Sequence, residues 1–128
     1  MSVQLNHTIV WCQDQRLSAT FLADTLGLRP PTHFGPFLVV EAANGVSLDF
    51  QETDGAIASQ HYAFLVTEDD FDEIFDRITG QRVNYWADPG MDQAGKINRN
   101  DGGRGVYFKD PNGHLLEILT RPYGSGAA

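Results

Sequence analysis

The sequence contains a single cysteine and lacks both a long apolar run and a secretory leader pattern. Cys12 can form no internal disulfide, which is typical of proteins in a reducing compartment, and we expect it to pack as a small apolar residue. No apolar run approaches the roughly 20 residues of a membrane-spanning helix. The N-terminus has neither the basic start nor the apolar stretch of a signal peptide. These absences predict a cytoplasmic protein with no membrane partner.

Basic residues are also scarce. The 9 lysines and arginines are outnumbered by 17 aspartates and glutamates, which gives a net charge of −8. An acidic surface repels nucleic-acid phosphates, so we expect no nucleic-acid partner. The chain has no P-loop, no Gly-x-Gly-x-x-Gly after a strand and no Gly-x-Ser-x-Gly elbow. Nucleotide binding and serine hydrolysis therefore have little support.

What the sequence does contain is an internal repeat. When His7 is set against His61, residues 5–11 align with residues 59–65. Both segments have the pattern of a strand with a histidine near its start. A helical pattern follows each strand, because apolar residues recur at matching places. The second pattern has them at i, i+3, i+4 and i+7, namely at Phe71, Ile74, Phe75 and Ile78.

A second alignment relates two predicted hairpins. When Asp49 is set against Glu117, residues 37–50 align with residues 105–118 without a gap. Both segments have the pattern strand, Asn-Gly turn, strand, and Asn-Gly favours a hairpin because both residues tolerate positive φ. Each hairpin ends with one of the two carboxylates. The offset between the hairpins is larger than the offset between the histidines, which predicts an insertion in the second copy, within a loop at residues 87–104.

We therefore predict an α+β fold of two tandem β-α-β-β-β modules that form a curved mixed sheet, a half-barrel, around a metal cleft. The modules are expected at about residues 3–52 and 59–121 of a single domain that spans residues 1–128. The polar segment 52–60 would link them. The small-residue tail, 121–128, is expected to fray.

The repeat gives equivalent positions to side chains that can bind a metal. The first strands supply His7 and His61, and the final strands supply Asp49 and Glu117. Two histidines and one carboxylate leave metal positions open for water, substrate or O₂. This donor set suits Fe²⁺, Mn²⁺, Ni²⁺, Co²⁺ or Zn²⁺. A charged Glu117 between two leucines on a buried strand is costly unless compensated, and a metal is the simplest compensation.

Each of these side chains also has a structural alternative. Either histidine alone could be a packed edge or core residue. Glu117 could pair with an arginine such as Arg82 or Arg104. Asp49 has a side chain one methylene shorter than glutamate. It could bind the metal directly, transfer protons or act through water as a base, or be structural.

Candidates for substrate contact lie on the second copy. Tyr107, on the strand before the ligating carboxylate, could aim its hydroxyl at a substrate or pack in the core. Arg99, with Lys96 and Asn98 in the inserted loop, could hold an anionic substrate or solvate the loop. His114 is out of phase with the ligating carboxylate, so we expect it to be exposed.

These features resemble the vicinal oxygen chelate superfamily, which includes glyoxalase I, extradiol dioxygenases, fosfomycin-resistance thiol transferases and bleomycin-resistance proteins. The resemblance spans about residues 3 to 121. It is carried by the β-α-β-β-β duplication, the first-strand histidines and the closing Asp-Pro-Asn-Gly hairpin with its glutamate. It implies metal ligands at His7, His61 and Glu117. It places Asp49 where glyoxalase I has a fourth ligand, a glutamate.

The resemblance implies a small metal-dependent enzyme that acts on a small molecule with adjacent oxygens. The reaction would be that of a lyase or isomerase, with Asp49 as the base, or that of a ring-cleaving dioxygenase. The family also implies a homodimer. Ile9 and Gly105 replace a threonine and a serine of the fosfomycin enzymes. Two alternatives are a non-catalytic protein that sequesters a toxic small molecule and a scaffold with a degenerate site.

Overall fold

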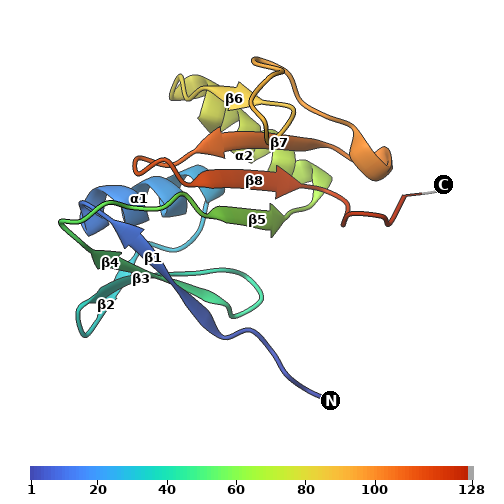
Figure 1. Ribbon diagram of the computed structural model, residues 1–128. Coiled ribbons are helices and arrows are strands. Elements are labelled where there is room, and N and C mark those ends of the chain that lie inside the picture. Colours follow the sequence, from blue (N-terminus) through green and yellow to red (C-terminus); the bar gives the residue numbers. More distant parts are fainter. Residues whose placement is uncertain (127–128) are drawn as a thin grey trace. The chain divides into compact units, whose positions relative to one another are not determined.

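The computed structural model describes residues 1–126, and the chain divides into two compact units, residues 1–58 and a second unit that begins at Ser59 (Figure 1). Neither α-helix of residues 1–126 combines the length and apolar character that crossing a membrane requires. Each unit has one helix and one four-stranded mixed sheet, in the order strand, helix, strand, strand, strand. This order confirms the predicted α+β fold of two β-α-β-β-β modules.

The first unit forms a sheet in the order β1-β4-β3-β2, in which β1 and β4 are parallel and the other pairs are antiparallel. Asp14 begins the helix by accepting a hydrogen bond from the Leu17 amide, and Gly27 ends it with a φ of 70°. The helix packs against β3 and β4. The elements are β1 (His7–Cys12), α1 (Gln15–Leu26), β2 (Thr32–Phe34), β3 (Phe37–Glu41) and β4 (Ser47–Glu52).

The second unit repeats this topology with the order β5-β8-β7-β6, and the first pair is again parallel. A short 3₁₀ helix, η1 (Asn100–Gly102), lies in the predicted inserted loop between β6 and β7. The loop is longer than its counterpart in the first unit, as the two alignments predict. The other elements are β5 (His61–Leu65), α2 (Glu68–Gly80), β6 (Tyr85–Trp86), β7 (Gly105–Lys109) and β8 (Leu115–Leu119).

Strand register shows that the two copies are equivalent at the level of single residues. Asp49 pairs with Ile9 on β1 and with Val39 on β3. Glu117 pairs with Ala63 on β5 and with Tyr107 on β7. The sequence alignments set these same partners against each other. Both carboxylates therefore occupy the same place in their sheets.

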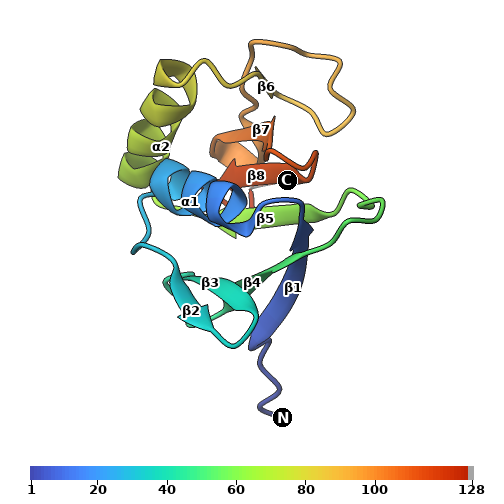
Figure 2. The same cartoon turned by 90° about the vertical axis from the view of Figure 1, so that its left-hand side faces the viewer.

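One face of the second sheet is covered by α2 (Figure 2). Thr67 begins the helix by accepting a hydrogen bond from the Asp70 amide, and the apolar face buries Phe71, Ile74 and Ile78. The Phe75 ring meets the Tyr85 ring edge-on at 5.0 Å. Because side chains alternate along a strand, the residues next to Tyr85 on its own strand point to the opposite face. That opposite face carries the site.

One expectation about side chains is wrong, and one structural alternative for Glu117 is not observed. His114 is buried, at 1% exposed, because its Nδ1 accepts a hydrogen bond from the Gln60 amide and its ring meets Tyr62 edge-on. Arg104 does not pair with Glu117, since its guanidinium binds Glu68 and Asp72 at 2.7 and 2.8 Å.

The tail does not fray at residues 121–126, where hydrogen bonds fold it into a turn. The last two residues of the predicted tail, 127 and 128, lie outside the described residues. Cys12 is buried, as expected of a packing residue.

Replacing Asp110 with alanine should destabilise the closing hairpin. Its Oδ1 accepts hydrogen bonds from the Asn112 and His114 amides at 2.9 and 2.8 Å, and the residue is 9% exposed. Without that carboxylate the buried His114 amide has lost its acceptor, which costs about 2 kcal/mol. Urea unfolding followed by circular dichroism measures the change. Asp24→Ala, on the exposed face of α1, is the control and should change stability by no more than about 0.5 kcal/mol.

Candidate functional site

The candidate site is a row of side chains across the second sheet. Register pairs Trp86 with Tyr107, Tyr107 with Glu117, and Glu117 with Ala63, from β6 through β7 and β8 to β5. Paired residues point to the same face of a sheet, so this row lies on the face opposite α2. His61 is two residues before Ala63 and shares the face.

At the centre of the row, His61 and Glu117 meet. Nε2 of His61 lies 3.0 Å from Oε1 of Glu117. The Glu117 side chain is 1% exposed, whereas that of His61 is 43% exposed. A buried carboxylate therefore lies directly beside a partly exposed histidine. The His61 ring also lies 5.8 Å from the Tyr107 ring, which walls this side of the pair.

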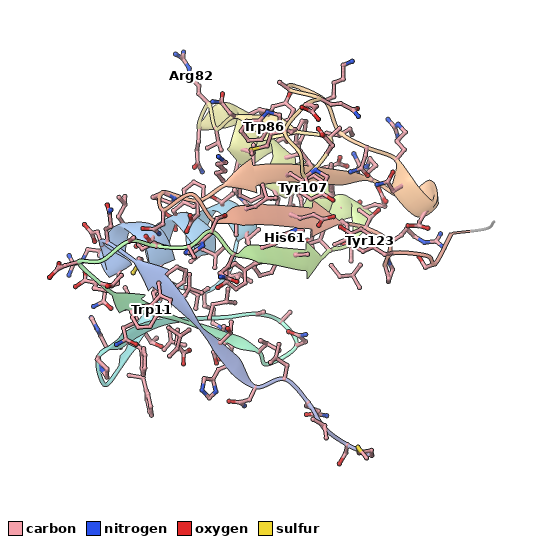
Figure 3. All side chains as sticks on the ribbon, in the orientation of Figure 1. Trp11, His61, Arg82, Trp86, Tyr107 and Tyr123 are labelled. Carbon is pink, nitrogen blue, oxygen red and sulfur yellow. The ribbon has the colours of Figure 1, made fainter. Side chains whose placement is uncertain are left out.

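A residue from the C-terminal segment completes the group. The Tyr123 hydroxyl lies 2.6 Å from both Oε1 and Oε2 of Glu117 and 3.0 Å from the Tyr107 hydroxyl (Figure 3). A hydroxyl has one proton, so Tyr123 donates to the carboxylate and accepts from Tyr107. Tyr123 is 62% exposed as a residue, but desolvation at its hydroxyl and the hydrogen bond to Glu117 raise the pKa of the phenol. Burial likewise raises the pKa of Tyr107, so both remain neutral phenols at pH 7.

The His61 and Glu117 atoms fit a divalent metal. Two ligand atoms about 2.1 Å from one ion and at a right angle are roughly 3.0 Å apart, which is the separation of Nε2 and Oε1. Imidazole nitrogen with carboxylate oxygen suits first-row divalent metals. Within each unit, over residues 1–126, no three His, Cys, Asp or Glu side chains gather into one cluster. The observed pair is two of the three predicted ligands.

The equivalent residues of the first unit, His7 and Asp49, have different hydrogen-bond partners from His61 and Glu117. His7 is exposed, and its Nδ1 lies 2.7 Å from the Asn6 side-chain oxygen. Asp49 is 9% exposed, and its Oδ1 has no hydrogen-bond partner among residues 1–126. A buried carboxylate oxygen with no donor is costly, which is typical of a group that awaits a ligand or a proton. The two residues share one face of their sheet, because His7 is two residues before the partner of Asp49.

The predicted substrate contacts differ in their surroundings. Tyr107 is 4% exposed and joins the group at Glu117. Arg99 is exposed and directly precedes η1, and over residues 1–126 no hydrogen bond or ion pair links it to that group. Asn98 closes the inserted loop, since its Nδ2 donates to the Ala87 carbonyl and its Oδ1 accepts from the Asn100 amide.

Tyr123 is the site residue that sequence reasoning missed. The segment after β8 is short, polar and rich in small residues, which favours a frayed end. The available signal was local: an aromatic residue stands between Pro122 and Gly124, two residues that favour turns. Such a turn, directly after the strand that carries Glu117, returns the aromatic ring to that strand.

The Glyoxalase/Bleomycin resistance protein/Dioxygenase superfamily model matches residues 4–118, and the chain belongs to this family. Among its relatives is the "Glutathione transferase FosA" of Serratia marcescens, 30% identical over 124 residues that cover 92% of this chain and 81% of that protein. The family match confirms the resemblance inferred from the two histidines and the closing hairpin.

Two solved structures are much more similar. "Oxidase ChaP-H2" is 64% identical with a TM-score of 0.97, and the match covers 99% of this chain and 100% of that chain. "Oxidase ChaP-H1" is 60% identical with a TM-score of 0.95, and the match covers 96% and 99% of the two chains. A lactoylglutathione lyase from Agrobacterium tumefaciens, 18% identical with a TM-score of 0.70 over 93% of this chain and 94% of its own, shares the fold.

Proposed function

We propose that this protein is a metal-dependent oxidase of its superfamily that uses O₂ to oxidise a small molecule with adjacent oxygens. The His61–Glu117 pair carries the proposal, because a half-exposed imidazole and a buried carboxylate present two metal-binding atoms at a separation compatible with one octahedral ion. The similarity to two structures named oxidases favours oxidation over isomerisation. Adjacent oxygens, as in a catechol, suit a metal that keeps two positions open.

The proposed ligands are His7, His61 and Glu117, and the proposed metal is Fe²⁺, Mn²⁺, Ni²⁺, Co²⁺ or Zn²⁺. When bound, the metal would supply Lewis-acid chemistry at the substrate oxygens and, for a redox-active ion, electron transfer to O₂. Two His and one carboxylate form the donor set of many iron oxygenases, so Fe²⁺ is the first ion to test.

Three residues have proposed roles toward the substrate. Among residues 1–126, the buried Oδ1 of Asp49 has no hydrogen-bond donor, so Asp49 is the candidate base that accepts a substrate hydroxyl proton. Tyr107 is the candidate hydrogen-bond partner of the substrate, because its hydroxyl already lies in the group around Glu117. Arg99, an exposed cation of the inserted loop, is the candidate contact for an anionic substrate group. We also propose a homodimer, which sedimentation velocity tests.

Metal content tests the function first. Protein purified without chelator and then offered each ion should retain close to one equivalent, measured by inductively coupled plasma mass spectrometry. His61→Ala removes a direct ligand, so its metal affinity should fall by roughly 100-fold. His33→Ala changes an exposed histidine of β2 and is the matched control, with unchanged affinity. Wild-type protein that binds none of the five ions would contradict metal dependence.

Oxygen consumption then separates the possible reactions. We expect the Fe²⁺-loaded protein to consume O₂ with catechol-type compounds and His61→Ala to consume none above the background of free iron. If the protein isomerises a hemithioacetal and takes up no O₂, it is a glyoxalase-type lyase and not an oxidase. Tight binding of an aromatic compound without turnover, in the metal-loaded protein, would favour the sequestering alternative.

A further inference from the structure

The segment after β8 forms a strap, defined here as residues 121–126. The Ser125 amide donates to the Pro122 carbonyl at 3.1 Å, which closes a turn with Tyr123 and Gly124 at its centre. Gly124 has a φ of 74°, a backbone conformation that favours glycine. The Arg121 guanidinium also donates to the Ser125 carbonyl at 3.1 Å. The turn returns the strap toward the sheet and projects Tyr123 from its centre.

The far end of the strap is seated on the inserted loop. The Gly126 amide lies 3.2 Å from Oδ1 of Asp101, a residue of η1. A Cβ on residue 126 would lie 2.5 Å from Cα of Asp101, closer than a real side chain can approach. Only glycine therefore allows this close contact. The strap is anchored at both ends, by β8 and by η1, so the position of Tyr123 is determined by the fold of the unit.

The geometry points to Tyr123 as a positioning residue for Glu117, one that holds the carboxylate ready to bind the metal. This inference rests on the proposed metal-dependent function. Tyr123 lies 2.6 Å from both carboxylate oxygens, while His61 lies 3.0 Å from Oε1. The carboxylate thus has a hydrogen-bond donor on one side and the second metal-binding atom on the other. Rotation away from His61 would break the contacts with Tyr123.

Tyr107 extends the restraint. Its hydroxyl lies 3.0 Å from that of Tyr123, and its ring lies 5.8 Å from the His61 ring. Hydrogen bonds therefore connect Tyr107 on β7, through Tyr123 of the strap, to the carboxylate of Glu117. Hydrogen-bonded partners of a metal ligand stabilise its orientation, and their loss typically weakens metal binding by about 10- to 100-fold. Tyr123 is expected to act in this way, without touching the metal itself.

The test is an anaerobic Mn²⁺ titration followed by electron paramagnetic resonance, which measures the free ion and needs no catalysis. Tyr123→Phe removes only the hydroxyl, and we expect the Kd for Mn²⁺ to rise by roughly 10-fold. Gly126→Ala displaces the strap from Asp101 and should raise the Kd in the same direction. Tyr62→Phe is the matched control, because Tyr62 follows His61 on β5 and points to the opposite face, so its Kd should equal that of wild type.

The outcomes separate positioning from other roles. If Tyr123→Phe binds Mn²⁺ as tightly as wild type, or more tightly, the tyrosine does not position the ligand and the inference is overturned. An unchanged Kd with a lowered unfolding midpoint of the metal-free protein would assign Tyr123 to strap stability alone and overturn it as well. Wild-type protein that binds none of the five ions would contradict the proposed function and remove the inference with it.

Discussion

Replacing Glu117 with glutamine is expected to lower the affinity for divalent metal by roughly 10²- to 10³-fold, the largest functional effect of any single change in this chain. The Glu117 side chain is 1% exposed, and its Oε1 lies 3.0 Å from Nε2 of His61. Glutamine removes the negative charge that would bind the cation directly, and loss of such a ligand should weaken binding by more than the roughly 10- to 100-fold that loss of a ligand's hydrogen-bonded partner costs. The amide also turns a donor group toward His61 or Tyr123, where the carboxylate only accepts.

Two measurements keep this prediction specific to the metal. Bound metal raises the unfolding midpoint of wild type by mass action, and this rise should disappear in Glu117→Gln. The metal-free variant should unfold close to metal-free wild type, because glutamine has nearly the same shape and avoids the burial of a charge. Glu41→Gln, on an exposed position of β3, should bind metal as wild type does. Normal metal affinity in Glu117→Gln would rule out Glu117 as a ligand.

Phe71→Ala should cause the largest loss of stability, about 3–5 kcal/mol. Phe71 is fully buried on α2 and stacks on Phe75 at 6.0 Å. The Arg104 guanidinium lies 4.4 Å from the centre of its ring. Truncation therefore leaves a cavity under the helix and removes the surface on which the arginine rests. Guanidinium chloride unfolding, followed by circular dichroism, measures the loss.

Two further variants decide whether the cavity is the cause. Phe71→Leu fills most of the space and should lose much less stability than the alanine variant. Phe34→Ala removes a ring that is 75% exposed and should change stability by no more than about 0.5 kcal/mol. A loss below about 1 kcal/mol in Phe71→Ala would mean that the helix does not depend on this side chain.

The fold was predictable because its signals are local and occur twice. A histidine on the first strand and a carboxylate after an Asn-Gly turn recur in the same order in both halves of the chain. Side chains alternate along strands, so a correct alignment also gives the register and the face of each residue. Ala63 and Tyr107 flank Glu117 as Ile9 and Val39 flank Asp49. The alignment thus predicted which residues share a sheet face.

The prediction for His114 failed because alternation predicts direction and not burial. His114 does lie out of phase with Glu117, on the opposite face. That face is the covered one, and the Gln60 amide satisfies the imidazole there. A polar residue is easily mistaken for an exposed one when its hydrogen-bond partner is distant in sequence.

By itself, the sequence determined the duplicated fold, the family and the candidate ligands His61 and Glu117, because periodicity and motif order act over short stretches of chain. Only the tertiary structure decided that Nε2 of His61 lies 3.0 Å from Glu117 and that Tyr123 completes the group. The strap owes its position to a glycine that meets Asp101, a residue far from it in the sequence, and to a hydroxyl that finds a buried carboxylate. Such contacts depend on segments that meet only after folding, so the local Pro122-Tyr123-Gly124 pattern could indicate a turn but not the carboxylate that its tyrosine meets.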